Sequence, residues 1–225
     1  MVEPKKDNGR PWREVARRVA HEATLREAEA RWGVGDHPAN YRWTHVQAVV
    51  AHAMRLAELT GADPDVVEAA AWLHDSAKQG KDDDHGIAGA IEAREVLAGT
   101  DFPPEKLDAV AGAIAKHVGL YVDEPVAPLA AAVLWDADKL TKLGAAGSLL
   151  QIAAWILAGS GPLDDLPASV DSQDWFEKTV ESFHTAPARE AGCRRLAAQR
   201  AFWARVAKEL AGDDLGSKAE DEEDR

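Results

Sequence analysis

The chain has 225 residues and a mass of 24.2 kDa, the size of one compact domain with a short extension. Hydrophobic residues make up 46% and charged residues 29%, so the apolar side chains suffice for a full core and exclude disorder throughout the chain. The net charge of −13 repels phosphate backbones and anionic lipid, which argues against a nucleic-acid polymer or a membrane surface as partner. A small anionic substrate would need local positive charge, such as a bound cation.

Cysteine content and the apolar segments bear on location. Cys193 is the only cysteine, so no intrachain disulfide can form, and a reducing, cytoplasmic location is expected. Residues 1–10 are polar and charged, unlike a secretory signal. Residues 143–163 lack charged side chains over the length of a bilayer span, but glycine, proline, serine and glutamine interrupt them. Their strongly apolar run, residues 149–157, predicts a buried core helix rather than a membrane span.

The pattern of apolar residues predicts an all-α protein. Apolar side chains recur at intervals of three and four residues, and alternation at period two is almost absent. Gly33 and Gly61 stand where helices end, and the pair Asp63-Pro64 is typical of a helix start. Helices are expected over residues 12–32, 41–59, 64–78, 84–97, 104–117, 129–143, 149–157, 172–184 and 187–211.

These elements divide the chain into three regions. Residues 1–40 form an N-terminal helix and loop, residues 41–211 form the core with C-terminal helices, and residues 212–225 form an acidic tail. From residue 213 onward the tail holds seven acidic and two basic residues and contributes −5 to the net charge. Such a composition predicts disorder.

Four of the eight histidines fall on expected helices or at their edges: His45, His74, His85 and His117. His74 is followed at once by Asp75. Imidazole and carboxylate groups are the ligands that suit Mn, Fe, Ni, Co or Zn, and side chains from several helices can enclose such an ion. The segment LHDSAK is therefore a candidate site.

The spacing of residues adds two lysines to the candidate site and places two nearby aspartates on different faces of one helix. Lys78 follows Asp75 by three residues and shares its helix face, where its ammonium could meet a metal-bound phosphate. Lys142 follows Asp138 by four residues and shares its helix face. Asp136 and Asp138 point about 200° apart on a helix, so both cannot reach one centre. We expect Asp136 to be a hydrogen-bond acceptor behind the site or a surface residue.

Together these motifs resemble those of the HD-domain metal-dependent phosphohydrolase superfamily. The resemblance covers residues 41–147 and rests on the first histidine in RWTHVQAVV, the His-Asp pair in AAWLHDSAK and the late aspartate in WDADKL. It implies an HD-domain helical bundle with additional N- and C-terminal helices. It also implies a divalent metal, Mn, Fe, Co, Ni, Mg or Zn, held by His45, His74, Asp75 and Asp138.

Some branches of this superfamily bind a second metal through two further histidines. His85 and His117 stand where those would be expected, and Gly86 and Gly89 would let helices approach closely behind His85. The ten residues from Asp75 to His85 are few for some two-metal branches. One ion, with these histidines lining the substrate pocket, and two ions therefore both remain open.

The resemblance implies a phosphohydrolase acting on phosphoester or phosphoanhydride bonds. Asp75 would orient or deprotonate the nucleophilic water, and the phosphate would be bound by Lys78, His85, His117 and Lys142. Residues 175–203 are similar to the tail region of a bacterial branch thought to act on nucleotides, through Phe176, Lys178, Thr185 and Arg189. Small nucleotide-like substrates are thus expected. The protein is expected to be a monomer or a homodimer. The alternatives are an HD-type di-iron oxygenase and a non-catalytic HD-like regulatory protein.

The remaining histidines and the tryptophans next to the motifs are expected to be structural. His52, two turns after His45, is expected to pack at the edge of the core. Trp43, Trp72 and Trp135 lie within three residues of expected ligands and could stack on a base, but core packing is the preferred interpretation. Surface positions are expected for His21, His37 and His184.

Overall fold

The computed structural model describes residues 11–33, 35, 36, 40–79 and 85–215, and in these residues it is helical throughout, with no strand. The helices are α1 (Trp12–Trp32), α2 (Tyr41–Thr60), α3 (Pro64–Leu73), α4 (His85–Ala98), α5 (Leu107–Ala115), α6 (Leu129–Leu140), α7 (Gly144–Leu157), α8 (Leu166–Asp171), α9 (Trp175–Glu181) and α10 (Ala186–Ala211). Short 3-10 turns, Pro104–Lys106 and Leu163–Asp165, precede α5 and α8. The expectation of an all-α fold is confirmed.

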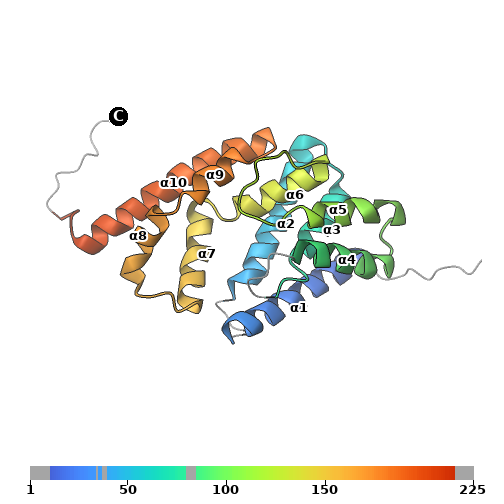
Figure 1. Cartoon of the computed structure of the whole chain (residues 1–225), viewed down its shortest axis with the longest axis horizontal. Helices are drawn as coiled ribbons and strands as arrows, with labels where there is room; N and C mark the ends of the chain where they lie inside the picture. Colours follow the sequence, from blue (N-terminus) through green and yellow to red (C-terminus); the bar gives the residue numbers. More distant parts are fainter. Residues whose placement is uncertain (1–10, 34, 37–39, 80–84, 216–225) are drawn as a thin grey trace, which may run out of the picture.

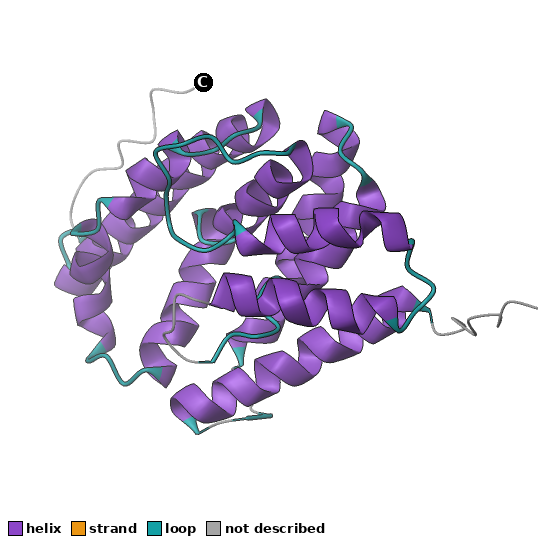
Figure 2. Ribbon diagram, turned by 45° about the vertical axis from the view of Figure 1, so that its right-hand side comes forward, coloured by secondary structure: helices purple, strands orange, loops and turns teal. Residues whose placement is uncertain are grey.

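Helices α1 to α6 pack together into a bundle, and α7 and α8 pack against α10 beside it (Figure 1). The turned view shows the described part of the chain as helices joined by loops (Figure 2). Val49, Leu73, Ile114 and Leu134 are fully buried and come from α2, α3, α5 and α6. The bundle core is therefore built by the same helices that carry the candidate site residues.

Local signals set the ends of the first helices where the sequence predicted them. Gly61 adopts a left-handed conformation with φ of 77° after α2, and its amide donates to the Ala57 carbonyl. The Asp63 side chain accepts hydrogen bonds from the amides of Asp65 and Val66, so α3 starts at Pro64. The α3 helix ends at Leu73 rather than near Lys78, which places His74 and Asp75 in a turn at its C-terminal end.

The helix expected over residues 172–184 is present but shorter, as α9, and a further helix that was not expected, α8, precedes it. A break at Ser172–Asp174 separates α8 from α9. The Arg200 guanidinium of α10 donates to the carbonyls of Val170 (3.1 Å) and Gln173 (2.8 Å) at this break. These bonds satisfy backbone acceptors that a continuous helix would have used internally.

The uncharged segment also differs from expectation. It forms α7, but Leu149 and Ile156 are 67% and 57% exposed, so the prediction of a buried core helix was wrong. No single helix among the described residues is long and apolar enough to cross a membrane; α6 and α7 reach that length only together, with a 67° bend between them. Most of α6 is buried in the bundle.

Candidate metal centre

The candidate site residues of the bundle line one cavity of about 180 Å³. Arg42 and His45 come from α2, Asp75 and Lys78 from the turn after α3, and Asp138 from α6. His85 begins α4 and His117 follows α5, while Lys142 lies in the turn after α6. His74 is fully buried directly behind this cavity, with its Nε2 3.4 Å from that of His45. Five segments of the sequence thus meet at one point.

Two glycines allow this convergence, as the sequence predicted. A Cβ atom on Gly86 would lie 2.8 Å from the Val118 side chain, and one on Gly89 would lie 3.4 Å from the His74 carbonyl oxygen. Both glycines are on α4, which packs closely against α5 at this end. The absence of side chains here brings His85 up to His117, so that their Nε2 atoms are 3.2 Å apart.

Asp75 lies at the middle of the cluster. Its Oδ2 atom faces His45 Nε2 at 3.7 Å and His74 Nε2 at 3.4 Å. Its Oδ1 atom faces His85 Nε2 at 3.2 Å and His117 Nε2 at 3.4 Å. Asp138 adds its Oδ1 atom 3.4 Å from His45 Nε2. The side chains of His45, His74 and Asp138 form one group that could hold a metal, and those of His74, Asp75 and His117 form another.

Hydrogen bonds on the far side of each ring determine which imidazole nitrogen carries the proton. Nδ1 donates to the Ala71 carbonyl in His74 (2.8 Å) and to the Ile114 carbonyl in His117 (2.6 Å). The Thr141 hydroxyl donates to the Asp138 carbonyl, so its oxygen must accept from His45 Nδ1 at 3.0 Å. In each neutral ring Nε2 therefore presents a lone pair toward the centre, the arrangement of metal-binding histidines.

The electrostatics of the cluster favour these protonation states. Burial, followed by the charge of Arg42, holds the pKa of His45 well below its ordinary value, and burial lowers that of His117 to about 4. Burial alone would raise the pKa of Asp75, but nearby positive charge, including that of Arg42, outweighs it and holds the pKa well below the usual range. Neutral imidazoles beside ionised carboxylates are the state in which both bind cations.

The donor set fits a divalent cation. The unprotonated Nε2 atoms of His45 and His74 face each other at 3.4 Å, and no hydrogen bond can form between two lone pairs. Asp75 and Asp138 are buried beside them, with exposed fractions of 8% and 4%. A cation among these atoms would remove the repulsion between the facing lone pairs.

Sequence reasoning missed a series of buried ion pairs behind Asp75. Arg42, only 6% exposed, donates from Nε to Glu27 Oε2 at 2.5 Å and from its second guanidinium nitrogen to Asp75 Oδ2. Glu27 is buried on α1. One signal was available for Arg42, because it precedes His45 by three residues and so shares its helix face.

Lys139 is the second residue that sequence reasoning missed. It is 1% exposed, and its Nζ donates to the His117 carbonyl at 2.6 Å and to Asp138 Oδ2 at 2.5 Å. The ammonium also lies 4.1 Å from the centre of the Trp135 ring. Burial lowers the pKa of Lys139 to about 8 against the opposing charge of Asp138. Lys139 thus connects the residue that follows α5 to the aspartate of α6.

Two lysines expected at the site are present at its edge. Lys142 Nζ lies 2.7 Å from Asp138 Oδ1, and Lys78 Nζ lies 3.7 Å from Asp75 Oδ1. Their side chains are 28% and 23% exposed. Both ammonium groups therefore border the cavity where solvent enters it.

Asp136 lies away from this cavity, as its helical position predicted, but it is fully buried rather than at the surface. Its carboxylate accepts hydrogen bonds from the backbone amides of His184 (2.9 Å) and Thr185 (2.8 Å). These amides immediately precede α10, so Asp136 attaches the start of that helix to α6. It does not support the ligands, and the expectation of an acceptor behind the site is replaced by this structural role.

The other histidines and the tryptophans next to the motifs pack as structural residues, with two differences in burial from the expected positions. His52 packs against α10, and His21 is exposed with its ring against Trp43. His184 is half-buried rather than on the surface, and Trp43 is partly exposed and stacks on Trp72. Trp135 is fully buried. His37 and most of the acidic tail lie outside the described residues.

The geometry defines an all-helical protein with a buried His-Asp centre, and the comparison with known families agrees. Residues 42–143 match the family model of the HD domain. None of the curated proteins matches the sequence significantly.

Solved structures show that the fold is shared with other proteins. The Bacillus subtilis protein YpgQ, solved in complex with ADP, is 21% identical with a TM-score of 0.61, and the alignment covers 92% of this chain and 99% of YpgQ. An HD-superfamily hydrolase from Bacillus thuringiensis is 20% identical with a TM-score of 0.60, and the alignment covers 87% of this chain and 98% of that protein. The likeness extends over nearly the whole chain, including the C-terminal helices.

Proposed function

We propose that this protein is a divalent-metal-dependent phosphohydrolase that cleaves phosphoester or phosphoanhydride bonds of small nucleotide-like substrates. The observation that carries the proposal is the set of unprotonated Nε2 atoms that faces Asp75 and Asp138 beside a cavity edged by two lysines. Histidine and aspartate bind the ion, whereas lysine ammonium groups attract the phosphate.

His45, His74, Asp75 and Asp138 are the proposed ligands of the first ion. The two oxygens of Asp75 face different histidine pairs, which favours a second ion held by Asp75, His85 and His117. A bound divalent ion polarises a phosphate oxygen and lowers the pKa of coordinated water, so that hydroxide is available near neutral pH.

The remaining steps belong to the side chains. Asp75 is ionised and central, so it can orient the attacking water. Lys78 and Lys142, at the cavity edge, would neutralise the charge that develops on the phosphate in the transition state. If only one ion binds, His85 and His117 would contact the phosphate instead of a metal.

Substrate size and charge support the nucleotide-like class. A cavity of about 180 Å³ accommodates a phosphate group with its immediate neighbours, and the net charge of −13 disfavours polymeric nucleic acid. The ADP complex of YpgQ supports a nucleotide as the small phosphorylated partner. The base preference and the bond cleaved are left to the experiment below.

The test begins with metal analysis of protein purified without chelator. Phosphate and pyrophosphate release would then be measured over nucleoside mono-, di- and triphosphates with Mn²⁺, Mg²⁺, Co²⁺ or Ni²⁺. We expect one or two ions per chain and metal-dependent release. Because the loss of a residue that only supports a ligand already costs about 10- to 100-fold, Asp75→Ala and Asp138→Ala should each lower turnover by about 100-fold or more.

Asp108→Ala is the matched control, because the Asp108 side chain is 90% exposed and pairs only with Arg94 at the surface. It should retain wild-type metal content and turnover. Full turnover by a metal-free Asp75→Ala protein would contradict the proposal.

The position of Asp75 between two histidine pairs also suits a di-iron oxygenase, the second candidate function. Two irons per chain with oxygen-dependent turnover, and no phosphate release with any metal, would favour it. Bound metal with neither reaction would favour a non-catalytic regulatory protein.

A further inference from the structure

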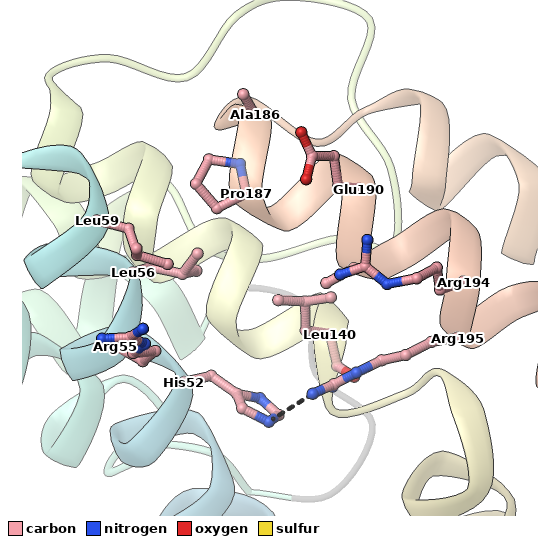
Figure 3. A pocket seen from close by; sticks show the side chains of 11 residues that line it. His52, Arg55, Leu56, Leu59, Leu140, Ala186, Pro187, Glu190, Arg194 and Arg195 are labelled. Atoms are coloured by element: carbon pink, nitrogen blue, oxygen red, sulfur yellow. Dashed lines mark hydrogen bonds between the residues drawn. The ribbon is translucent and has the colours of Figure 1, made fainter.

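A second cavity, of about 390 Å³, lies between α2 and the first turns of α10 (Figure 3). We call it the α2–α10 groove; residues 52–59 of α2, Leu140 and residues 186–195 of α10 contain all its lining side chains. It shares no lining residue with the cavity of the metal centre. His52 follows His45 by two turns of α2, which separates the two sites by about 10 Å along that helix.

The inner surface of the groove is apolar. Leu56 and Leu140 are nearly buried at its base, and Leu59 is 51% exposed on the α2 wall. Pro187 faces them from α10 (Figure 3). Apolar surface open to water favours a ligand with an apolar body, because its burial is stabilising.

The rim of the groove is positively charged although the whole chain is acidic. Arg55, Arg194 and Arg195 line it, with Glu190 as the one acidic lining residue. Arg55 lies 2.6 Å from Glu58 outside the groove, whereas Arg194 extends over the groove from α10 (Figure 3). The charge of this surface is therefore opposite to that of the molecule and complementary to an anion.

Arg195 lacks an acidic partner. It is half-buried, and its two guanidinium nitrogens donate to the Leu140 carbonyl at 2.7 Å and to His52 Nε2 at 3.1 Å. Within the described residues it makes no ion pair, and burial lowers its pKa. A cation removed from water with only neutral partners is destabilised, and a bound anion would offset this cost.

We propose that the α2–α10 groove binds a small organic anion, with its apolar body on Leu56, Leu59 and Pro187 and its phosphate or carboxylate group between Arg194 and Arg195. The volume falls in the range of small-molecule sites, and guanidinium groups recognise both kinds of anion through paired hydrogen bonds. This site is separate from the proposed hydrolase centre and does not depend on its activity.

Fluorescence titration with 1-anilinonaphthalene-8-sulfonate, an aromatic ring system with one sulfonate, tests the proposal on the full-length protein. We expect one saturable site per chain that weakens at high salt. Leu59→Glu places a negative charge on the apolar wall and should abolish this binding, whereas Leu210→Glu, at a leucine 58% exposed outside the groove, should not. Arg194→Gln should raise the dissociation constant about tenfold, because a charge-assisted hydrogen bond is lost.

Arg205→Gln, which removes an exposed arginine of the same helix outside the groove, should leave binding unchanged. Displacement by phenyl phosphate but not benzoate would identify a phosphate ligand, and the reverse a carboxylate; benzyl alcohol should displace nothing. Equal effects of the two leucine variants, or insensitivity to Arg194→Gln, would show adventitious adsorption only and overturn the proposal. Arg194→Gln alters an exposed side chain, so it remains decisive if Leu59→Glu fails to fold.

Discussion

His45 and His52 lie on the same face of α2, two turns apart, and invite comparison. The His52 Nε2 atom accepts a hydrogen bond from Arg195, which can only donate, so its lone pair is satisfied within the protein. The His45 Nε2 atom is also unprotonated, but it faces His74 Nε2 at 3.4 Å and Asp138 Oδ1 at 3.4 Å. The Nε2 atom of the same residue type thus has a protein donor in one place and faces only other acceptors in the other.

The cationic side chains near these two histidines also differ in their hydrogen-bond partners. Lys139 has a carboxylate partner, Asp138, whereas Arg195 has only neutral partners. The region around His45 thus has an excess of acceptors, and the region around His52 has an excess of positive charge. The comparison teaches that the local balance of donors and acceptors, rather than the residue type, indicates which kind of ligand each cavity would bind.

The largest expected effect is on the free energy of unfolding, and it distinguishes Lys139 from Arg195. In chelator-treated protein, Lys139→Met should lower the free energy of unfolding by about 3 kcal/mol, because Asp138 loses a buried partner. Arg195→Met removes hydrogen bonds to neutral groups and should cost about 1 kcal/mol. Urea unfolding measures both values. Equal losses would mean that the carboxylate partner makes no difference.

The next effect tests the tautomer of His45. Thr141→Val removes the acceptor for His45 Nδ1, so the ring can place its proton on Nε2, and Mn²⁺ affinity should fall about tenfold. Calorimetric titration with Mn²⁺ measures the change. Thr60→Val is the control, since the Thr60 hydroxyl donates to the Leu56 carbonyl away from the centre. Unchanged affinity in Thr141→Val would mean that the hydrogen bond does not fix the tautomer.

The smallest effect concerns pH and His52. Burial, followed by the charge of Arg195, lowers the pKa of His52 from 6.5 to about 4. As pH falls below about 6.5 the unfolded chain binds the proton first, so stability present above that pH is lost toward pH 4. This histidine should account for about 1 kcal/mol of the loss between pH 7 and pH 5.5.

His52→Gln keeps an acceptor for Arg195 but cannot be protonated, so its unfolding free energy should fall less over this interval than that of the wild type. His21→Gln, at an exposed histidine, should follow the wild type. Identical pH dependence in His52→Gln and the wild type would show that His52 is not held neutral by its surroundings.

The sequence by itself determined the all-helical fold, the limits of α1 and the starts of α2 and α3, because periodicity, glycine stops and the Asp63 cap act within a few residues. It also named the four histidines and two aspartates that meet at the centre, since their motifs are local. It missed α8 and misjudged the burial of α7, where the outcome depends on contacts with α10 or on their absence.

Only the tertiary structure decided what surrounds the ligands. Arg42, Glu27 and Lys139 are charged residues of ordinary helical spacing, and nothing within their own segments shows that they are buried. Their burial follows from partners 15 to 33 residues away, as in the bonds from Arg42 to Glu27 and Asp75. The α2–α10 groove likewise joins residues 143 positions apart, His52 and Arg195. Helix formation depends on near neighbours, whereas the environment of a charge depends on how the helices pack.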